Sequence, residues 1–212
     1  MLDNNGFDLW ANTYDKSVKT SDENNIYPFA GYEKIINEIL KIIIENKKLT
    51  VLDIGIGTGV LSNELYKNGY KITGIDFSDE MIKKSKERMP SAKLIQHDFS
   101  KGLPENLSNE KFDYIVSTYT FHHLNDNEKL IFIKKLLEKL NRNGLIIIGD
   151  IAFQTRKQLN EWKSMNKNEW DNDEHYLVYD EIETRLKNNC RIEFYQISIC
   201  AGIFIIMDIN EK

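Results

Sequence analysis

Hydrophobic and polar residues follow two alternating patterns along most of the chain. Short, almost wholly apolar runs, such as residues 49–54 and 145–150, predict buried strands of a parallel sheet. Between such runs apolar residues recur every three to four positions, as over residues 32–46, and this spacing predicts helices. A chain that repeats strand and helix in this way is expected to have an α/β fold, in which helices wrap an open parallel sheet.

The C-terminal part departs from this pattern. Residues 191–199 and 202–209 are predicted strands joined only by Cys200 and Ala201, and so short a link requires an antiparallel pair. With 212 residues the chain is expected to form one domain, 1–212. We divide it into an N-terminal lid segment (1–31), a core (32–151), a polar cap insert (152–177) and a helix with the antiparallel strands (178–212).

The composition of the chain limits the cell compartments and the binding partners that we expect for the protein. The formal net charge is −5, so the sequence offers no general basic surface for nucleic acid. Two cysteines are too few for a disulfide framework. No apolar run approaches the roughly 20 residues that a membrane helix needs, and the N-terminal residues do not have the pattern of a signal peptide. We therefore expect a cytoplasmic protein with no nucleic-acid and no membrane partner.

A glycine-rich loop follows the first predicted strand. Gly55, Gly57 and Gly59 lie where that strand ends and the next helix begins. Glycine permits a tight turn and a close approach of a ligand, and an open α/β sheet binds ligands at this edge. The dinucleotide fingerprint G-x-G-x-x-G would need glycine where the chain has Val60, which weakens a nicotinamide assignment. The alternative is a turn that only packs a helix on the sheet.

Two carboxylates follow the next two predicted strands. Asp76 ends the second strand, where a carboxylate can accept hydrogen bonds from both hydroxyls of a ribose. Asp98 follows the third strand and can accept from an adenine amine, with Phe77 or Phe99 packing on the ring. Together with the glycine loop, these groups predict a nucleoside ligand at the carboxyl edge of the sheet.

Four segments resemble motifs of the class I S-adenosylmethionine-dependent methyltransferases. They are VLDIGIGTG, GIDFS, QHDFS and FDYIVSTYTFHHL. The resemblance extends over nearly the whole chain and is strongest to a small bacterial branch, the YrrT-like methyltransferases, in which the position of Asp76 often holds Glu. It implies S-adenosyl-L-methionine as cofactor and a cofactor-binding core at 32–151. It also implies a Rossmann-like seven-stranded sheet of order 3-2-1-4-5-7-6, with strand 7 antiparallel and helices on both faces.

The same resemblance implies further contacts. Gly55 and Gly57 approach the amino-acid part of the cofactor, and Ser117 lies near its methionine portion. Asp53 orients the glycine loop through backbone amides rather than touching the ligand. Tyr14 closes over the sulfonium from the N-terminal segment.

Methyl transfer from a sulfonium releases a neutral leaving group, so no acid is needed. A base is needed only where the acceptor must lose a proton. His122 and Tyr119, after the fourth strand, are the candidates, and the alternative is that each only packs or lines the pocket. His122 and His123 are adjacent, so we expect their side chains to diverge, and the histidine spacing predicts no metal site.

The segments outside the common core are expected to bind the methyl acceptor. Both 1–31 and 152–177 are rich in aromatic residues, which suit a small, partly apolar metabolite. The N-terminal aromatic residues could equally serve a dimer contact, so a monomer and a homodimer both stay open. Two other functions also stay open: an inactive protein that binds S-adenosylmethionine or S-adenosylhomocysteine, and a nicotinamide-dependent oxidoreductase.

Overall fold

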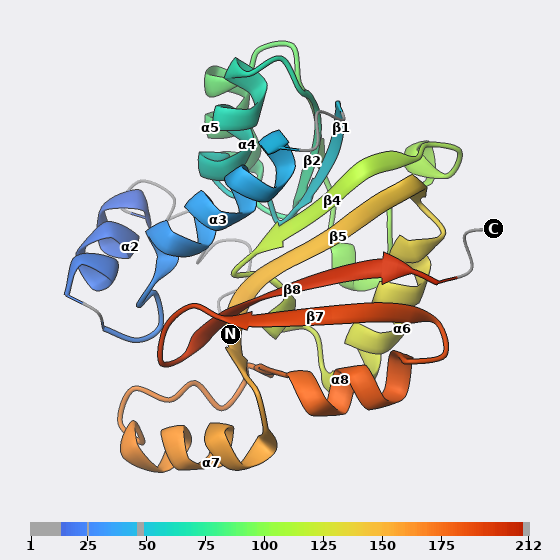
Figure 1. The fold of residues 1–212 in the computed structure, drawn as a ribbon. Helices are drawn as coiled ribbons and strands as arrows, with labels where there is room; N and C mark the ends of the chain where they lie inside the picture. The colour runs from blue at the N-terminus through green and yellow to red at the C-terminus, as the bar shows by residue number, and fades with distance from the viewer. Residues whose placement is uncertain (1–13, 25, 46–48, 210–212) are drawn as a thin grey trace.

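A central sheet runs through the molecule, and helices cover both of its faces (Figure 1). The computed structural model describes residues 14–24, 26–45 and 49–209. The seven longer strands lie in the order β3-β2-β1-β4-β5-β8-β7. Their bounds are β1 Thr50–Ile54, β2 Lys71–Asp76, β3 Lys93–Gln96, β4 Phe112–Thr118, β5 Leu140–Phe153, β7 Cys190–Gln196 and β8 Ala201–Asp208.

The strand directions agree with the sequence prediction. The strands from β3 to β5 pair in parallel. Strand β8 runs antiparallel to β5, with Ile148 opposite Phe204, and β7 runs antiparallel to β8. Counted over the seven longer strands, this is the predicted order 3-2-1-4-5-7-6 with an antiparallel strand 7, so the fold class is confirmed. A two-residue strand, β6 (Leu177–Val178), pairs with the end of β5.

Two apolar layers hold the helices on the sheet. One layer contains Ile39, Leu65 and Met89, which belong to α3, α4 and the end of α5. The other contains Leu136 of α6 and Leu186 of α8. Each side chain of this size contributes about 1.5–3 kcal/mol when it is fully buried. The bounds are α3 Tyr32–Glu45, α4 Val60–Lys67, α5 Asp79–Arg88, α6 Asp126–Leu137 and α8 Tyr179–Leu186.

Polar caps fix where α5 and α6 begin. Ser78 Oγ accepts a hydrogen bond from the Met81 amide at 3.2 Å. Asn125 and Glu128 form a capping box at the start of α6. These caps satisfy amides that a helix leaves without internal partners. Because α5 directly follows β2, its cap also fixes the chain where the ligand edge is predicted.

Two further helices contribute little to the two layers. Helix α2 (Tyr14–Glu23) precedes α3, and α7 (Arg156–Met165) lies beyond the end of β5 (Figure 1). The hydrophobic pattern did not predict α7, because Leu159 is its one buried residue among those described. Short 3-10 turns complete the chain: η1 Phe99–Lys101, η2 Glu105–Leu107 and η3 Phe121–His123. No helix in the described part of the chain is long and apolar enough to cross a membrane.

Candidate active site

The glycine loop lies between β1 and α4 and has a left-handed backbone. Gly55, Gly57 and Gly59 have φ angles of 68°, 55° and 77°, which side chains other than hydrogen rarely permit. A Cβ on Gly55 would lie 2.3 Å from the Thr120 hydroxyl, and one on Gly59 would lie 2.8 Å from Met89 Cε. A Cβ on Gly57 would meet no atom within 4 Å. The loop therefore packs against the protein at two glycines and leaves open space at the third.

Asp76 holds this loop in place. Its Oδ2 accepts a hydrogen bond from the Gly57 amide at 2.8 Å, and its Oδ1 accepts one from the Ser78 amide at 2.9 Å. The side chain is buried, so these bonds form away from bulk water. From the sequence we expect Asp53 to orient the loop through backbone amides. That expectation is wrong, because the amide of Gly57 binds the carboxylate at the end of β2 instead.

Asp53 is a buried carboxylate with one unsatisfied oxygen. Its Oδ2 accepts a hydrogen bond from Ser62 Oγ at 2.6 Å, whereas its Oδ1 has no hydrogen-bond partner among the described residues. Burial raises the pKa of Asp53 to about 7; the Ser62 hydrogen bond opposes this shift, and the charge of Asp76 adds to it. A buried acceptor without a donor costs about 1–3 kcal/mol. A cationic donor from a ligand would remove this cost.

The predicted adenine residues separate into two environments. Asp98 Oδ1 accepts hydrogen bonds from the amide and hydroxyl of Ser100, and its Oδ2 lies 3.1 Å from Lys101 Nζ. Burial opposes the shift, but these contacts lower the pKa of Asp98. Phe99 is buried in the core, with its ring centroid 5.7 Å from that of Phe132. Phe77 is half-buried, so it is the ring nearer to solvent at this edge.

Two further residues from the sequence analysis have structural positions of their own. Ser117 is buried, and its hydroxyl donates to the Ile54 carbonyl at 2.9 Å, which ties the end of β4 to the end of β1. Tyr14 begins α2, but its side chain lies outside the described part of the structure.

His122 is held by a buried aspartate. His122 lies in η3, after β4, and its Nδ1 is 2.7 Å from Oδ1 of Asp150 on β5. Asp150 Oδ2 also accepts the amides of His122 and Thr120, each at 3.2 Å. Burial alone would lower the pKa of His122, but the Asp150 carboxylate outweighs burial and raises it. The pair therefore fixes both the ring and the turn that carries it.

The other ring nitrogen of His122 faces the cap insert. His122 Nε2 is 3.6 Å from Glu174 Oε1, and Glu174 Oε2 accepts a hydrogen bond from the Tyr176 hydroxyl at 2.8 Å. The Tyr176 hydroxyl is also hydrogen-bonded to that of Tyr27. Trp170 packs edge-on against Tyr176 and parallel to Tyr27, with centroid distances of 4.8 and 6.2 Å. The N-terminal segment and the cap thus meet beside His122.

Tyr119 follows β4 and packs against the N-terminal segment and the start of α3. Its ring contacts those of Phe29 and Tyr32, with centroid distances of 5.3 and 5.2 Å. Its hydroxyl is buried and has no partner among the described residues. Burial raises the pKa of Tyr119 well above its usual range, so the phenol keeps its proton at neutral pH. This environment favours the pocket-lining role over that of a base.

The structure also corrects the expectation for the two adjacent histidines, and it adds two residues to the site. His122 and His123 do not diverge: their ring centroids are 4.2 Å apart. Sequence reasoning missed Asp150 and Glu174. A charged residue at the end of the apolar run 145–150 was a usable signal, since a buried charge needs a partner. The polar insert gave no comparable signal for Glu174.

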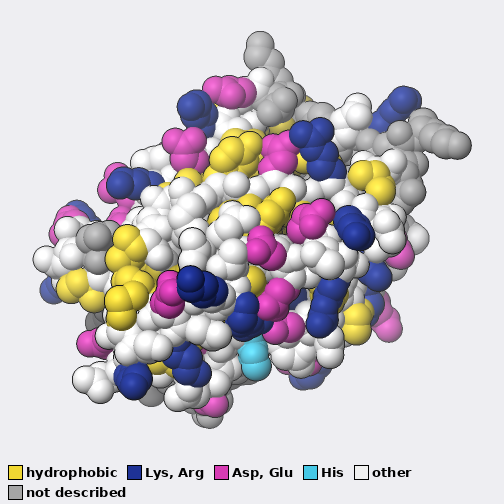
Figure 2. Space-filling view, turned by 60° about the horizontal axis from the view of Figure 1, so that its bottom comes forward, with side chains coloured by type: hydrophobic (Ala, Val, Ile, Leu, Met, Phe, Trp, Pro, Cys, Tyr) yellow, Lys and Arg dark blue, Asp and Glu magenta, His cyan; other side chains and the backbone are white. Residues whose placement is uncertain are grey.

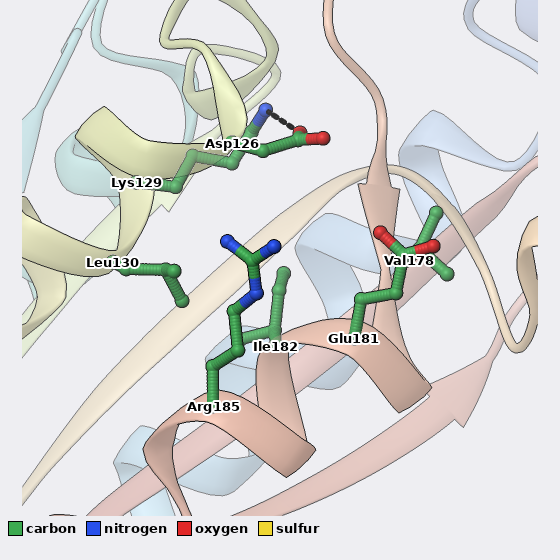
Figure 3. A pocket seen from close by; sticks show the side chains of 7 residues that line it. All are labelled: Asp126, Lys129, Leu130, Val178, Glu181, Ile182 and Arg185. Atoms are coloured by element: carbon green, nitrogen blue, oxygen red, sulfur yellow. Dashed lines mark hydrogen bonds and ion pairs between the residues drawn. The ribbon is translucent and has the colours of Figure 1, made fainter.

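A small pocket lies between α6 and α8 (Figure 3). Lys129 is almost fully buried there, and its Nζ donates to the Leu124 carbonyl at 2.6 Å and lies 3.4 Å from Asp126 Oδ1. Burial lowers the pKa of Lys129, while Asp126 and Asp150 oppose that shift. Lys129 is thus a buried basic group held by the Leu124 carbonyl and by Asp126.

Comparison with known proteins identifies the family. Residues 45–194 match a family described as "Methyltransferase domain", which covers well over half of the chain. The chain belongs to the class I S-adenosylmethionine-dependent methyltransferases. This membership argues against the nicotinamide-dependent oxidoreductase that the glycine spacing left open.

Relatives and solved methyltransferases resemble the chain over most of its length. It is 33% identical over 177 residues to an "uncharacterized methyltransferase" of Alkaliphilus oremlandii (strain OhILAs), with 84% of this chain and 78% of the relative covered. A Bacillus cereus (strain ATCC 10987 / NRS 248) protein of the same name is 35% identical over 192 residues, covering 86% of each. A DhpI–SAH complex has a TM-score of 0.72 at 15% identity, covering 97% of this chain and 94% of that one. At that identity the structural likeness supports the fold alone.

Proposed function

We propose that this methyltransferase transfers the methyl group of S-adenosylmethionine to a small-molecule acceptor by in-line displacement. The observation that carries the proposal is the open backbone at Gly57, whose amide binds the buried carboxylate of Asp76, with a second buried carboxylate, Asp53, close enough to feel the charge of Asp76. The unsatisfied Oδ1 of Asp53 fits the ammonium of the cofactor's amino-acid part. Asp76, at the end of β2, fits the ribose hydroxyls.

The remaining cofactor contacts follow from the neighbouring strand ends. Asp98 is proposed to accept from the adenine amine, and Phe77 to pack on the adenine ring, since Phe99 is committed to the core. Ser117 is proposed to lie near the methionine portion and to act through the Ile54 carbonyl that it binds. Tyr14 stays a proposed sulfonium contact from the N-terminal segment.

The methyl acceptor is proposed to bind on the His122 side of the glycine loop. Thr120, two residues before His122, packs directly against Gly55, so the two parts of the site are adjacent. Displacement from a sulfonium depends on alignment and on exclusion of water. The aromatic side chains of Tyr119, Trp170 and Tyr176 supply apolar walls for this purpose, and His122, held by Asp150, supplies the polar group that meets the acceptor.

The charge distribution supports a small acceptor over a nucleic acid. On the face shown in Figure 2, basic and acidic side chains are interspersed and no basic stripe is visible. A chain with a net charge of −5 is expected to attract the phosphates of a nucleic acid only weakly. A partly apolar metabolite fits the aromatic side chains better.

The proposal is tested by incubating the protein with S-adenosylmethionine that carries an isotopically labelled methyl group and with a small-molecule extract of a bacterium. Mass spectrometry then searches for labelled products, with Asp76→Ala as the control. A labelled metabolite formed by the wild type alone is the expected result. Cofactor binding without any labelled product would favour the inactive binding protein, and label on macromolecules alone would contradict the small-molecule acceptor.

A further inference from the structure

Two imidazoles and a carboxylate converge where η3 meets the cap insert. One ligand-capable atom from each of His122, His123 and Glu174 lies within 4.8 Å of the others. The distance between His122 Nε2 and Glu174 Oε1 is 3.6 Å. Zinc bonds of about 2.0–2.1 Å in a tetrahedral arrangement place ligand atoms about 3.3 Å apart, so small side-chain movements would close the three groups on an ion.

We propose that His122, His123 and Glu174 form a binding site for a divalent transition-metal ion, with zinc as the fitting ion. Two imidazole nitrogens and one carboxylate oxygen form a donor set that suits zinc and does not suit magnesium or calcium, which prefer oxygen ligands. Three protein ligands leave a coordination position open, as in catalytic zinc sites. This site goes beyond the proposed methyl transfer: it shares His122 with the proposed acceptor side, and metal binding to it is tested without the transfer reaction.

The residues around the three ligands support the assignment. A metal-binding histidine usually donates its other ring N–H to a carboxylate, which fixes the ring and its tautomer. Asp150 Oδ1 lies 2.7 Å from His122 Nδ1 and thus directs Nε2 toward Glu174. The second oxygen of Glu174 accepts a hydrogen bond from Tyr176, which orients the first oxygen toward the histidines. His122 and Glu174 are thus each oriented by a hydrogen bond at the atom that does not face the proposed ion.

The local charge favours a cation. The carboxylates of Asp150 and Glu174 bring two negative charges to His122, and the buried ammonium of Lys129 brings one positive charge. Figure 3 shows Lys129 directed to Asp126 at the start of α6. The net negative charge beside the two imidazoles favours a bound cation.

The site is accessible at its Glu174 end. A cavity of about 210 Å³ is lined by Glu174, His175 and Tyr176 together with residues of α7. Glu174 is partly exposed, with 20% of its side-chain surface accessible. An ion can therefore reach the carboxylate through the cap, without unfolding of the core.

The test is titration of zinc into the full chain after removal of metals with a chelator, followed by a competing chromophoric chelator. We expect one ion per chain with a Kd of about 1 μM or tighter. Glu174→Gln and His123→Gln should each weaken binding at least tenfold, and Tyr176→Phe should weaken it by about tenfold. His175→Gln is the matched control, because His175 is exposed beside Glu174 but lies outside the cluster. Its affinity should equal that of the wild type.

Three results would overturn the proposal: wild-type binding weaker than about 100 μM, unchanged affinity in Glu174→Gln, or an equal loss in His175→Gln. Circular dichroism checks that each variant is folded. If the ligand variants fail to fold, cobalt binding to the wild type decides the matter. Strong visible absorption typical of four-coordinate cobalt supports the site, and the weak absorption of six-coordinate cobalt contradicts it.

Discussion

The carboxylate of Asp76 and the backbone of Gly57 are joined by a hydrogen bond of 2.8 Å. This bond ties the end of β2 to the point of the glycine loop where an added Cβ would meet no atom within 4 Å. The residue proposed for the ribose and the open backbone are therefore parts of one unit. A change at either position should act on cofactor binding more than on the core.

Gly57→Ala should weaken cofactor binding without unfolding the protein. At φ 55° an alanine costs about 1–2 kcal/mol of stability, and its methyl group would occupy the open space that the cofactor is proposed to fill. We expect the affinity for S-adenosylhomocysteine to fall by at least tenfold, as measured by calorimetric titration.

Gly69→Ala is the matched control for this variant. Gly69 has φ 85°, and a Cβ on it would also meet no atom within 4 Å, but it follows α4, at the end of that helix away from the glycine loop. The two variants should lose similar stability in denaturant unfolding, and Gly69→Ala alone should keep wild-type affinity. Equal affinities in both would show that the cofactor does not approach Gly57.

Cofactor affinity should rise with pH through neutrality because of Asp53. Burial raises the pKa of Asp53 from 3.8 to about 7, so the carboxyl is protonated below that pH and ionised above it. Only the ionised form attracts the cofactor's ammonium. We expect S-adenosylhomocysteine to bind more tightly at pH 8 than at pH 6, and Asp53→Asn to remove most of this dependence.

Without cofactor, the same pKa shift predicts a change in stability of the opposite sign. The unfolded chain ionises Asp53 near pH 3.8 and the folded chain near pH 7, so this group's contribution to stability is lost as pH rises between these values. Asp53→Asn should therefore gain stability relative to the wild type over this range. Parallel stability–pH curves for the two proteins would contradict the assignment.

Asp150→Asn should be strongly destabilising. Asp150 is fully buried and accepts hydrogen bonds from the ring of His122 and from the amides of Thr120, His122 and Ile151. Removal of one partner from a buried charged pair costs about 3–5 kcal/mol. Denaturant unfolding measures this loss, and Glu38→Gln, an exposed change on α3, should stay within about 0.5 kcal/mol of the wild type. A similar small change in Asp150→Asn would mean that the pair does not hold η3.

The sequence predicted the parts of the site that depend on local pattern. Short segments of sequence were enough to predict the glycine loop, Asp76 at the end of its strand, and the antiparallel C-terminal strands. Each depends on the residue types of one turn or on the length of one link. The pairing of His122 with Asp150 and Glu174 joins residues 28 and 52 positions apart, in separate elements, so it becomes visible only in the folded chain. Helix α7 escaped prediction because so little of its surface is buried.

The roles of Phe77 and Phe99 likewise depend on contacts between distant elements, which local sequence patterns do not reveal. Phe77 and Phe99 each follow a strand and precede a helical turn, so the sequence could not choose between them. The structure separates them, because Phe99 packs on Phe132 of α6 while Phe77 stays half-buried. That choice depends on the packing of α6, which no local pattern near Phe99 reveals.

The most direct test of the account is calorimetric titration of S-adenosylmethionine, S-adenosylhomocysteine and NAD into the wild type and Asp76→Ala. Hydrogen bonds to a charged group contribute about 1.5–3 kcal/mol, so the variant should bind the first two ligands roughly 10- to 150-fold more weakly. We expect micromolar binding of both to the wild type and no binding of NAD. A folded wild type that binds neither, or an Asp76→Ala variant with unchanged affinity, would contradict the proposed cofactor site.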